Sequence, residues 1–121
     1  MNYLERALVV RQPWVSKILY NHKDWEMRSR NTKVRGPIGL IEAGSGLIVG
    51  RTEIIDCLSF LAAKSLQDNK DRHQVDNLAL LEKWHTAWVL NNTLSFDSPI
   101  PYNHPRGAVT WVNIESYKIP I

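Results

Sequence analysis

Apolar and polar positions in the first half of the chain recur with the spacing of short strands. Apolar runs at 7–11, 38–43 and 47–57 predict three strands. Residues 24–30 alternate apolar and charged side chains, and this period of two predicts a further strand with one face of each kind. The glycine-rich residues 44–46 predict a tight link between the second and third apolar runs. This half of the chain therefore favours a β-rich fold.

A helical stripe interrupts these strands after the first one. Pro13 suits the first position of a helix, because its fixed φ is helical and its missing N–H is not needed there. Asn21 is the predicted left-handed stop, since asparagine tolerates positive φ. Between them, four apolar side chains fall on one helical face: Trp14, Val15, Ile18 and Leu19.

The second half begins with helical patterns and returns to strands. The predicted order is a short helix at 60–67, a charged loop at 68–72, a helix at 75–85, a strand at 86–90, an extended segment at 98–101, a loop at 103–107 and a last strand at 108–114. Strands at both ends with helices between them predict an α+β fold whose sheet closes into a small barrel. Closure removes exposed sheet edges, which otherwise promote aggregation.

Composition agrees with a single domain over residues 1–121. The chain has 44% hydrophobic and 22% charged residues, and its length matches one typical domain. A lone cysteine, Cys57, forms no internal disulfide, which favours a reducing, cytoplasmic location. The sequence has neither an apolar run of roughly 20 residues, as a membrane span needs, nor the features of a signal peptide. The net charge of +3 permits a nucleic-acid partner without requiring one.

Charged side chains gather in and just before the alternating strand. Lys23 precedes it, and Glu26, Arg28 and Arg30 share one of its faces. Strands disfavour several of these residue types, so either solvent or a ligand must compensate. In the first case the charges pair on an exposed face. In the second, a carboxylate between two cations stays ionised and accepts a hydrogen bond from a base or acts as a general base, while arginine offers a planar fork to phosphate.

Several stretches of the chain together resemble the ASCH family of the PUA-like superfamily. They are Arg11–Trp14, Asn21–Arg28, Arg35–Ile41 and Gly46–Gly50. The family signature is G-x-K-x-x-E-x-R, and Lys23, Glu26 and Arg28 match its lysine, glutamate and arginine. Asn21 stands in place of the glycine. Late segments also resemble the family's closing strands, so the resemblance extends over nearly the whole chain.

The resemblance implies a small PUA-like β-barrel with a cleft beside the first helix. Family members are taken to bind RNA or other nucleic acid there, and some are enzymes. One branch hydrolyses the acetyl amide of N4-acetylcytidine with the signature lysine, a threonine and a separate glutamate, and another member is described as a ribonuclease. Lys23 matches that lysine, whereas Glu26 stands where the branch has threonine. Glu53 and Glu82 are open candidates for the separate glutamate.

The predicted partner is therefore RNA or a modified nucleoside in a basic cleft. Lys23 and Glu26 are the predicted catalytic residues. The predicted nucleic-acid-binding residues are Arg11, Gln12, Arg28, Arg30, Ser45 and Tyr102. Tyr102 and His104 are expected to be exposed in a late loop. No cofactor is predicted, and the four histidines lack the paired spacing of a metal site, although magnesium held by carboxylate and phosphate stays open.

Two functions stay open at this point. The chain is either a hydrolase, acting as an amidohydrolase or a ribonuclease, or a non-catalytic module that binds single-stranded RNA. An amidohydrolase would need a lowered pKa at Lys23, so that the amine can serve as a base or nucleophile. Burial beside Arg28 lowers that pKa and Glu26 raises it, and the sequence does not say which effect is larger.

Overall fold

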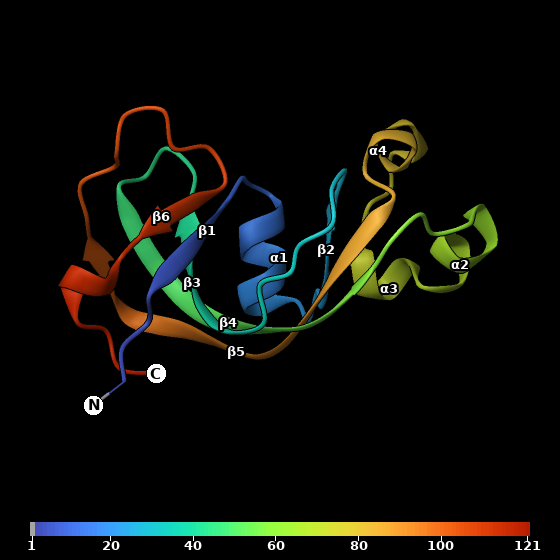
Figure 1. Ribbon diagram of the computed structural model, residues 1–121. Helices are drawn as coiled ribbons and strands as arrows, with labels where there is room; N and C mark the ends of the chain where they lie inside the picture. Colours follow the sequence, from blue (N-terminus) through green and yellow to red (C-terminus); the bar gives the residue numbers. More distant parts are fainter. Residues whose placement is uncertain (1) are drawn as a thin grey trace.

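Residues 2–121 are described by the computed structural model, and in them six strands form one curved sheet (Figure 1). The strands are β1 (Arg6–Val10), β2 (Trp25–Arg28), β3 (Gly36–Glu42), β4 (Leu47–Leu58), β5 (Thr86–Pro101) and β6 (Trp111–Asn113). Their order across the sheet is β2-β5-β4-β3-β1-β6. β1 and β3 are parallel, and the other neighbouring pairs are antiparallel. The predicted α+β class is therefore confirmed.

Helices occupy several places along this sheet. The described helices are α1 (Trp14–Tyr20), α2 (Ala63–Asp68), α3 (Lys70–His73), α4 (Leu78–Lys83) and the 3-10 helix η1 (Glu115–Tyr117). α1 lies within the curve of the sheet, whereas α2, α3 and α4 gather at the end of the molecule away from both termini (Figure 1). We call residues 59–85, which join β4 to β5, the helical insert. No helix among residues 2–121 is long and apolar enough to span a membrane.

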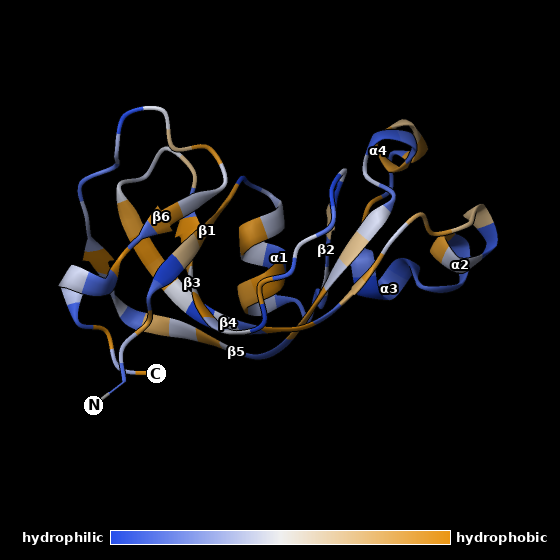
Figure 2. Ribbon diagram, viewed as in Figure 1, coloured by the Kyte–Doolittle hydropathy of each residue, from blue (hydrophilic) through white to orange (hydrophobic). Residues whose placement is uncertain are grey.

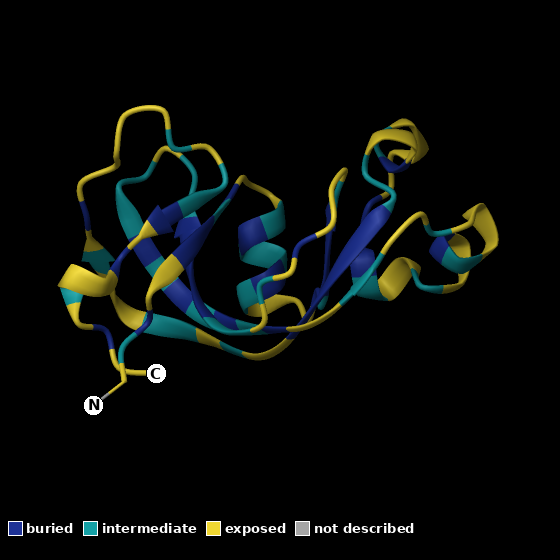
Figure 3. Ribbon diagram, in the orientation of Figure 1, coloured by how far each residue is buried: buried dark blue, intermediate teal, exposed yellow. Residues whose placement is uncertain are grey.

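The apolar stripe predicted for α1 packs it against the sheet. Val15 and Ile18 are buried in the main core. Gly50 of β4 makes close packing possible, because an added Cβ there would lie 2.5 Å from the Leu94 carbonyl oxygen and 2.7 Å from the Leu19 side chain. In Figure 2, α1 shows hydrophobic bands alternating with more hydrophilic ones, and in Figure 3 most of it is buried or half-buried. By contrast, α2 and α4 are exposed over much of their surface.

The sheet does not close into the predicted β-barrel. Within the described residues, the edge strands β2 and β6 each pair with one neighbour. They have four and three residues, and no hydrogen-bonded ladder joins the two described strands to each other. Side-chain contacts instead connect each edge strand to the neighbour of the other edge, β2 to β1 and β6 to β5. Arg28 donates to the Val9 carbonyl oxygen at 3.0 Å, and the rings of Trp88 and Trp111 stack with centroids 6.0 Å apart.

Several local predictions around the helices are wrong. Pro13 lies one position before α1 instead of at its first residue. Asn21 has φ −127° and its N–H bonds to the Lys17 carbonyl, and the positive φ of 57° falls on His22. The charged segment 68–72 contains part of α3 instead of a loop. The helical pattern at 75–85 produces a shorter α4, whose first turn donates to the Asn77 side chain.

Two strand predictions change in length. β5 joins the predicted strand at 86–90 and the extended segment at 98–101 into one 16-residue strand, because both parts pair with β4. The last strand covers only Trp111–Asn113 of the predicted 108–114, where it pairs with β1. In both cases the neighbouring strand sets the length.

Candidate functional site

A cleft of about 440 Å³ opens between β1, β2, the start of α1 and the helical insert. The signature residues Lys23, Glu26 and Arg28 contribute three of its charged side chains, and Arg11 contributes a fourth. The remaining lining comes from distant parts of the chain: Val9, Arg11, Trp14, Met27, Ala43, Gly44, Val75, Trp84, His104, Ala108 and Val109. The cleft therefore combines a small ionic cluster with largely apolar walls.

Lys23 is the most deeply placed of the three charges. It follows the left-handed His22, which turns the chain from α1 into β2. Its side chain is folded inward, and only 2% of the residue is exposed. The Nζ atom donates to the carbonyl oxygens of Trp25 and His73, both at 2.5 Å, and lies 5.3 Å from the centre of the Trp14 ring. The amine is thus held by backbone acceptors on two sides.

Burial lowers the pKa of Lys23 from 10.5 to about 8. The Glu26 carboxylate, whose Oε1 lies 3.8 Å from Nζ, opposes this shift, while the positive charges of Lys17 and Arg28 add to it. The effect of desolvation on the Lys23 pKa is therefore larger than the effect of the ion pair. The sequence alone did not decide between the two. A neutral amine keeps two N–H groups, enough to satisfy both carbonyl oxygens, and its lone pair stays available.

Glu26 and Arg28 form the second layer of the charged cluster. Glu26 is only 5% exposed, so this position of the charged face is covered, whereas Arg28 is half-buried and Arg30 is exposed. The Nε and one terminal nitrogen of Arg28 both approach Glu26 Oε2 at 3.0 Å. The Arg28 guanidinium also lies 5.4 Å from the Trp88 ring centre. Arginine thus occupies one carboxylate oxygen, and the other faces Lys23.

The predicted nucleic-acid-binding residues divide between the cleft and other sites. Arg11 is exposed and lines the cleft together with Arg28. Gln12 is exposed and donates to Glu42 at 2.8 Å. Ser45 holds its own turn, donating to the Glu42 carbonyl and accepting from Leu47 N–H. Gln12 and Ser45 do not line the cleft.

Arg30 and Tyr102 also lie outside the cleft lining. The Arg30 side chain is exposed, and its carbonyl accepts the Trp88 indole N–H at 2.8 Å. The expected exposure of Tyr102 is wrong, because the residue is 9% exposed and packs in an apolar core. Burial raises the pKa of its hydroxyl. That hydroxyl lies 2.7 Å from Nδ1 of His104, which is exposed as expected and lines the cleft.

Neither candidate for a separate catalytic glutamate lines the cleft. Glu53 lies on β4, where it contacts Arg51 at 3.4 Å and accepts from Asn92 at 3.0 Å. Glu82 is exposed on α4 and borders a different, apolar cavity. Within residues 2–121, no group of three or more His, Cys, Asp or Glu side chains is arranged to hold a metal ion.

Two aromatic residues of the cleft were not singled out as site residues. Trp14 and Trp84 meet edge to face with ring centroids 6.1 Å apart, and both are half-buried. Each belongs to an apolar helical stripe, and such a stripe predicts a core position. No local signal distinguishes a tryptophan that packs in the core from one that also borders a cleft.

The family is decided by comparison with known proteins. The model of the ASCH domain matches residues 8–100, which is more than half of the chain. The chain belongs to the ASCH domain family. Its fold is similar to the crystal structure of ASCH from Zymomonas mobilis, with a TM-score of 0.72, 11% identity, and coverage of 94% of this chain and 90% of the other. No curated protein matches the chain.

In this ASCH domain, the residues that match the family signature come together at one place. Lys23, Glu26 and Arg28 are consecutive members of one ionic cluster, and all three line the cleft. At the glycine position of the signature, the Asn21 side chain points out of the cleft toward α3, where it donates to Gln74 at 2.9 Å. The side chain that departs from the signature therefore lies outside the charged cluster.

Proposed function

We propose that the cleft binds the base of a modified nucleoside or of single-stranded RNA, and that the chain hydrolyses an amide on that base. The observation that carries this proposal is a buried lysine with a pKa of about 8 beside a buried carboxylate, both lining one cleft. A pKa near neutrality allows an amine to accept a proton at working pH.

The size and lining of the cleft support a base as the bound group. Ligand pockets typically have volumes of roughly 300–1,000 Å³, and 440 Å³ falls within this range. Trp14 and Trp84 offer aromatic surface, and stacking contributes roughly 1–3 kcal/mol per base. Arg11 at the exposed rim suits a phosphate or sugar oxygen.

Lys23 would act as the general base. In its neutral form it accepts a proton from water while the water oxygen bonds to the acyl carbon. The same proton then passes to the amide nitrogen as the carbon–nitrogen bond breaks, which produces a carboxylic acid and an amine. Glu26 Oε1 accepts a hydrogen bond from the bound nucleobase, and Arg28 keeps that carboxylate ionised through its contact with Oε2.

A non-catalytic RNA-binding module is the second candidate, and the contact between Glu26 and Arg28 favours it. Two of the three Arg28 nitrogens approach the same Glu26 oxygen, which suits a fixed recognition group. The amidohydrolase branch has threonine at this position. In the binding module the same cluster recognises a base and no bond is broken.

Turnover of N4-acetylcytidine separates these functions. We expect cytidine and acetate from the wild-type protein, at a rate that increases with pH as Lys23 loses its proton near pH 8. Lys23→Ala should lower kcat about 10²–10⁴-fold, the typical contribution of a general base. Lys33→Ala is the matched control, since Lys33 is an exposed lysine that borders a different pocket and does not line the cleft.

Binding of a labelled single-stranded RNA tests the alternative in parallel. Binding that weakens with salt and with Lys23→Ala, without turnover of the nucleoside, supports the module. If Lys23→Ala and Glu26→Ala change neither turnover nor binding, the cleft is not the functional site and both proposals fail.

A further inference from the structure

His73 is a buried titratable residue that the proposed chemistry does not use. It ends α3, and only 1% of it is exposed. Its backbone carbonyl is one of the two acceptors of Lys23 Nζ, across 50 positions of sequence. The helical insert therefore reaches the proposed general base through one backbone oxygen.

The His73 ring is held in one neutral tautomer. Its Nε2 lies 2.7 Å from the Leu66 carbonyl oxygen, so Nε2 must carry a hydrogen and donate it. Its Nδ1 accepts the Val75 N–H at 2.9 Å and must therefore be unprotonated. The ring thus fastens α2 on one side and the chain after α3 on the other.

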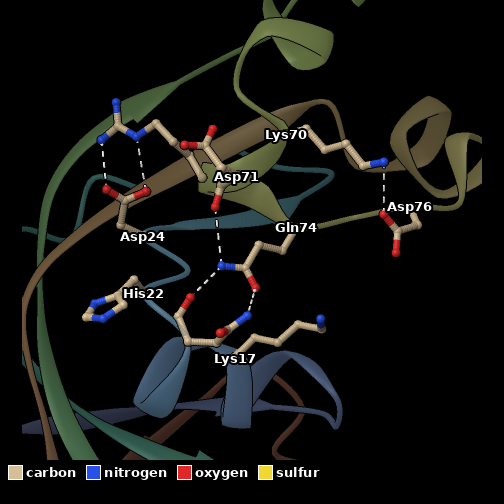
Figure 4. A pocket seen from close by; sticks show the side chains of 9 residues that line it. Lys17, His22, Asp24, Lys70, Asp71, Gln74 and Asp76 are labelled. Carbon is tan, nitrogen blue, oxygen red and sulfur yellow. Dashed lines mark hydrogen bonds and ion pairs between the residues drawn. The ribbon is translucent and has the colours of Figure 1, made fainter.

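The same turn is fastened to the loop that carries Lys23. Gln74, which is left-handed at φ 57°, exchanges hydrogen bonds with the side chain and carbonyl of Asn21 at 2.9 and 2.6 Å. Arg72 pairs with Asp24 through two nitrogens at 3.0 and 3.1 Å. Figure 4 shows these contacts, with Gln74 and Asp24 on facing segments. Residues 72–74 therefore form hydrogen bonds and an ion pair with the loop on both sides of Lys23.

We propose that His73 is a positioning residue for Lys23, and that protonation of its ring releases the carbonyl that holds the lysine amine. A proton on Nδ1 would face the Val75 N–H, so two donors would oppose each other and the turn would have to move. The consequence for catalysis rests on the proposed function, but the coupling between the two side chains does not.

The environment of the His73 ring is consistent with release of its carbonyl from Lys23 at acidic pH. Burial lowers the pKa of His73, and the cations Lys23 and Lys70 act in the same direction, while Asp71 and the bond to the Leu66 carbonyl oppose them. His73 also borders the apolar cavity already described beside Glu82. The other titratable groups that border this cavity are Asp76, Glu82 and His85. The neutral tautomer is therefore the form at neutral pH, and protonation requires pH below the usual histidine pKa of about 6.5.

Nuclear magnetic resonance of the intact chain tests this without any substrate. With carbon-13 in the lysine Cε positions and nitrogen-15 in the imidazole rings, the protein is titrated from about pH 9 to about pH 5, a range that includes the ordinary histidine pKa. We expect a step in the Lys23 signal near pH 8 and a second step that coincides with the His73 titration. A Lys23 signal that does not change while His73 titrates, or until the whole chain unfolds, would overturn the proposal.

Two variants separate positioning from a purely structural role. His73→Asn places a side-chain oxygen where it can accept the N–H two residues on, as in an Asx turn, and it does not titrate. We expect this variant to keep the step near pH 8 and to lose the acid step. His73→Ala lacks the acceptor and should move the Lys23 pKa upward from about 8. Equal Lys23 titrations in wild type and both variants would contradict the proposal.

His85→Asn is the matched control, because His85 borders the same cavity without contacting Lys23. It should keep both titration steps of the Lys23 signal.

Turnover is then measured separately. Coupled titrations in a protein without turnover would disprove the proposed hydrolase and leave the positioning role intact, whereas turnover with uncoupled titrations would do the reverse.

Discussion

Two ion pairs flank the same short turn, and they differ mainly in burial. Lys23 and Glu26 face the cleft, where their side chains are 1% and 6% exposed. Asp24 pairs with Arg72 on the opposite side, where the side chains are 39% and 42% exposed beside an open pocket of about 900 Å³ (Figure 4). Neighbouring residues of the same charge types thus lie in different environments.

The difference teaches that burial, more than the presence of a charged partner, sets the pKa of Lys23. Desolvation lowers the pKa of Lys23 even though a carboxylate lies 3.8 Å away. The outer pair has shorter contacts, but solvent screens it, so it fastens the loop and does not activate a group. The following predictions test this contrast, beginning with the largest effect.

Removing the inner carboxylate should have the largest effect on stability. Glu26→Ala leaves Lys23 and Arg28 without their shared counter-charge in a covered site, and breaking a buried pair in this way typically costs about 3–5 kcal/mol. Urea denaturation of the variant measures the loss. Asp24→Ala is the control, with a cost below about 1 kcal/mol. Equal costs at the two positions would remove the contrast.

Lys23 should make the unfolding free energy depend on pH in alkaline solution. Its pKa is about 8 in the folded chain and near 10.5 in the unfolded chain, so the unfolded chain binds more protons between these values. Stability contributed through Lys23 therefore increases from about pH 8 to about pH 10.5, by at most about 1.4 kcal/mol per pH unit. The measurement is the difference between wild type and Lys23→Met across this range. A difference that does not vary with pH contradicts the lowered pKa.

Salt should distinguish the two pairs by a smaller amount. A double-mutant cycle on Asp24 and Arg72 should yield about 0.5 kcal/mol at low salt and less in about 1 M salt, because exposed charges are screened. The cycle on Lys23 and Glu26 should change little with salt, since solvent ions do not enter a covered site. The contrast is wrong if the inner cycle is the more salt-dependent one.

Restoring the signature glycine should have a modest effect on stability and little effect on the inner site. Asn21→Gly removes the side-chain pair with Gln74 and adds backbone freedom, so a cost of about 1 kcal/mol is expected. No backbone strain is relieved, because φ at this residue is −127°. Thermal unfolding checks the cost, and the Lys23 titration near pH 8 should persist. Loss of that titration would show that the outer contacts control the inner site more than we expect.

Sequence spacing located the charged cluster and most of the sheet. Lys23, Glu26 and Arg28 were predicted together from the signature, and they line one cleft. Alternation assigned Glu26 and Arg28 to one face of β2 but did not show what covers that face. Trp84 and His73 were missed as parts of the site, because they reach it from 50 or more positions away in the chain.

The closed barrel was the main error in the predicted fold. Strand patterns show how many strands a chain forms, but closure depends on whether the two edge strands pair. Here β2 and β6 do not pair within the described residues. Arg28 of β2 bonds to β1 instead, and Trp111 of β6 stacks on Trp88 of β5. Strand β5 shows the opposite case, since pairing with β4 extends it beyond its own apolar pattern.

The sequence by itself determined the α+β class, the helix after the first strand and the identity of the charged cluster, because these depend on local periodicity and on a short motif. Only the tertiary structure decided that Glu26 is covered, that Lys23 is held by the His73 carbonyl, and that burial lowers the pKa of that lysine. The physical reason is that desolvation depends on everything packed around a group, and here much of that material comes from the distant helical insert.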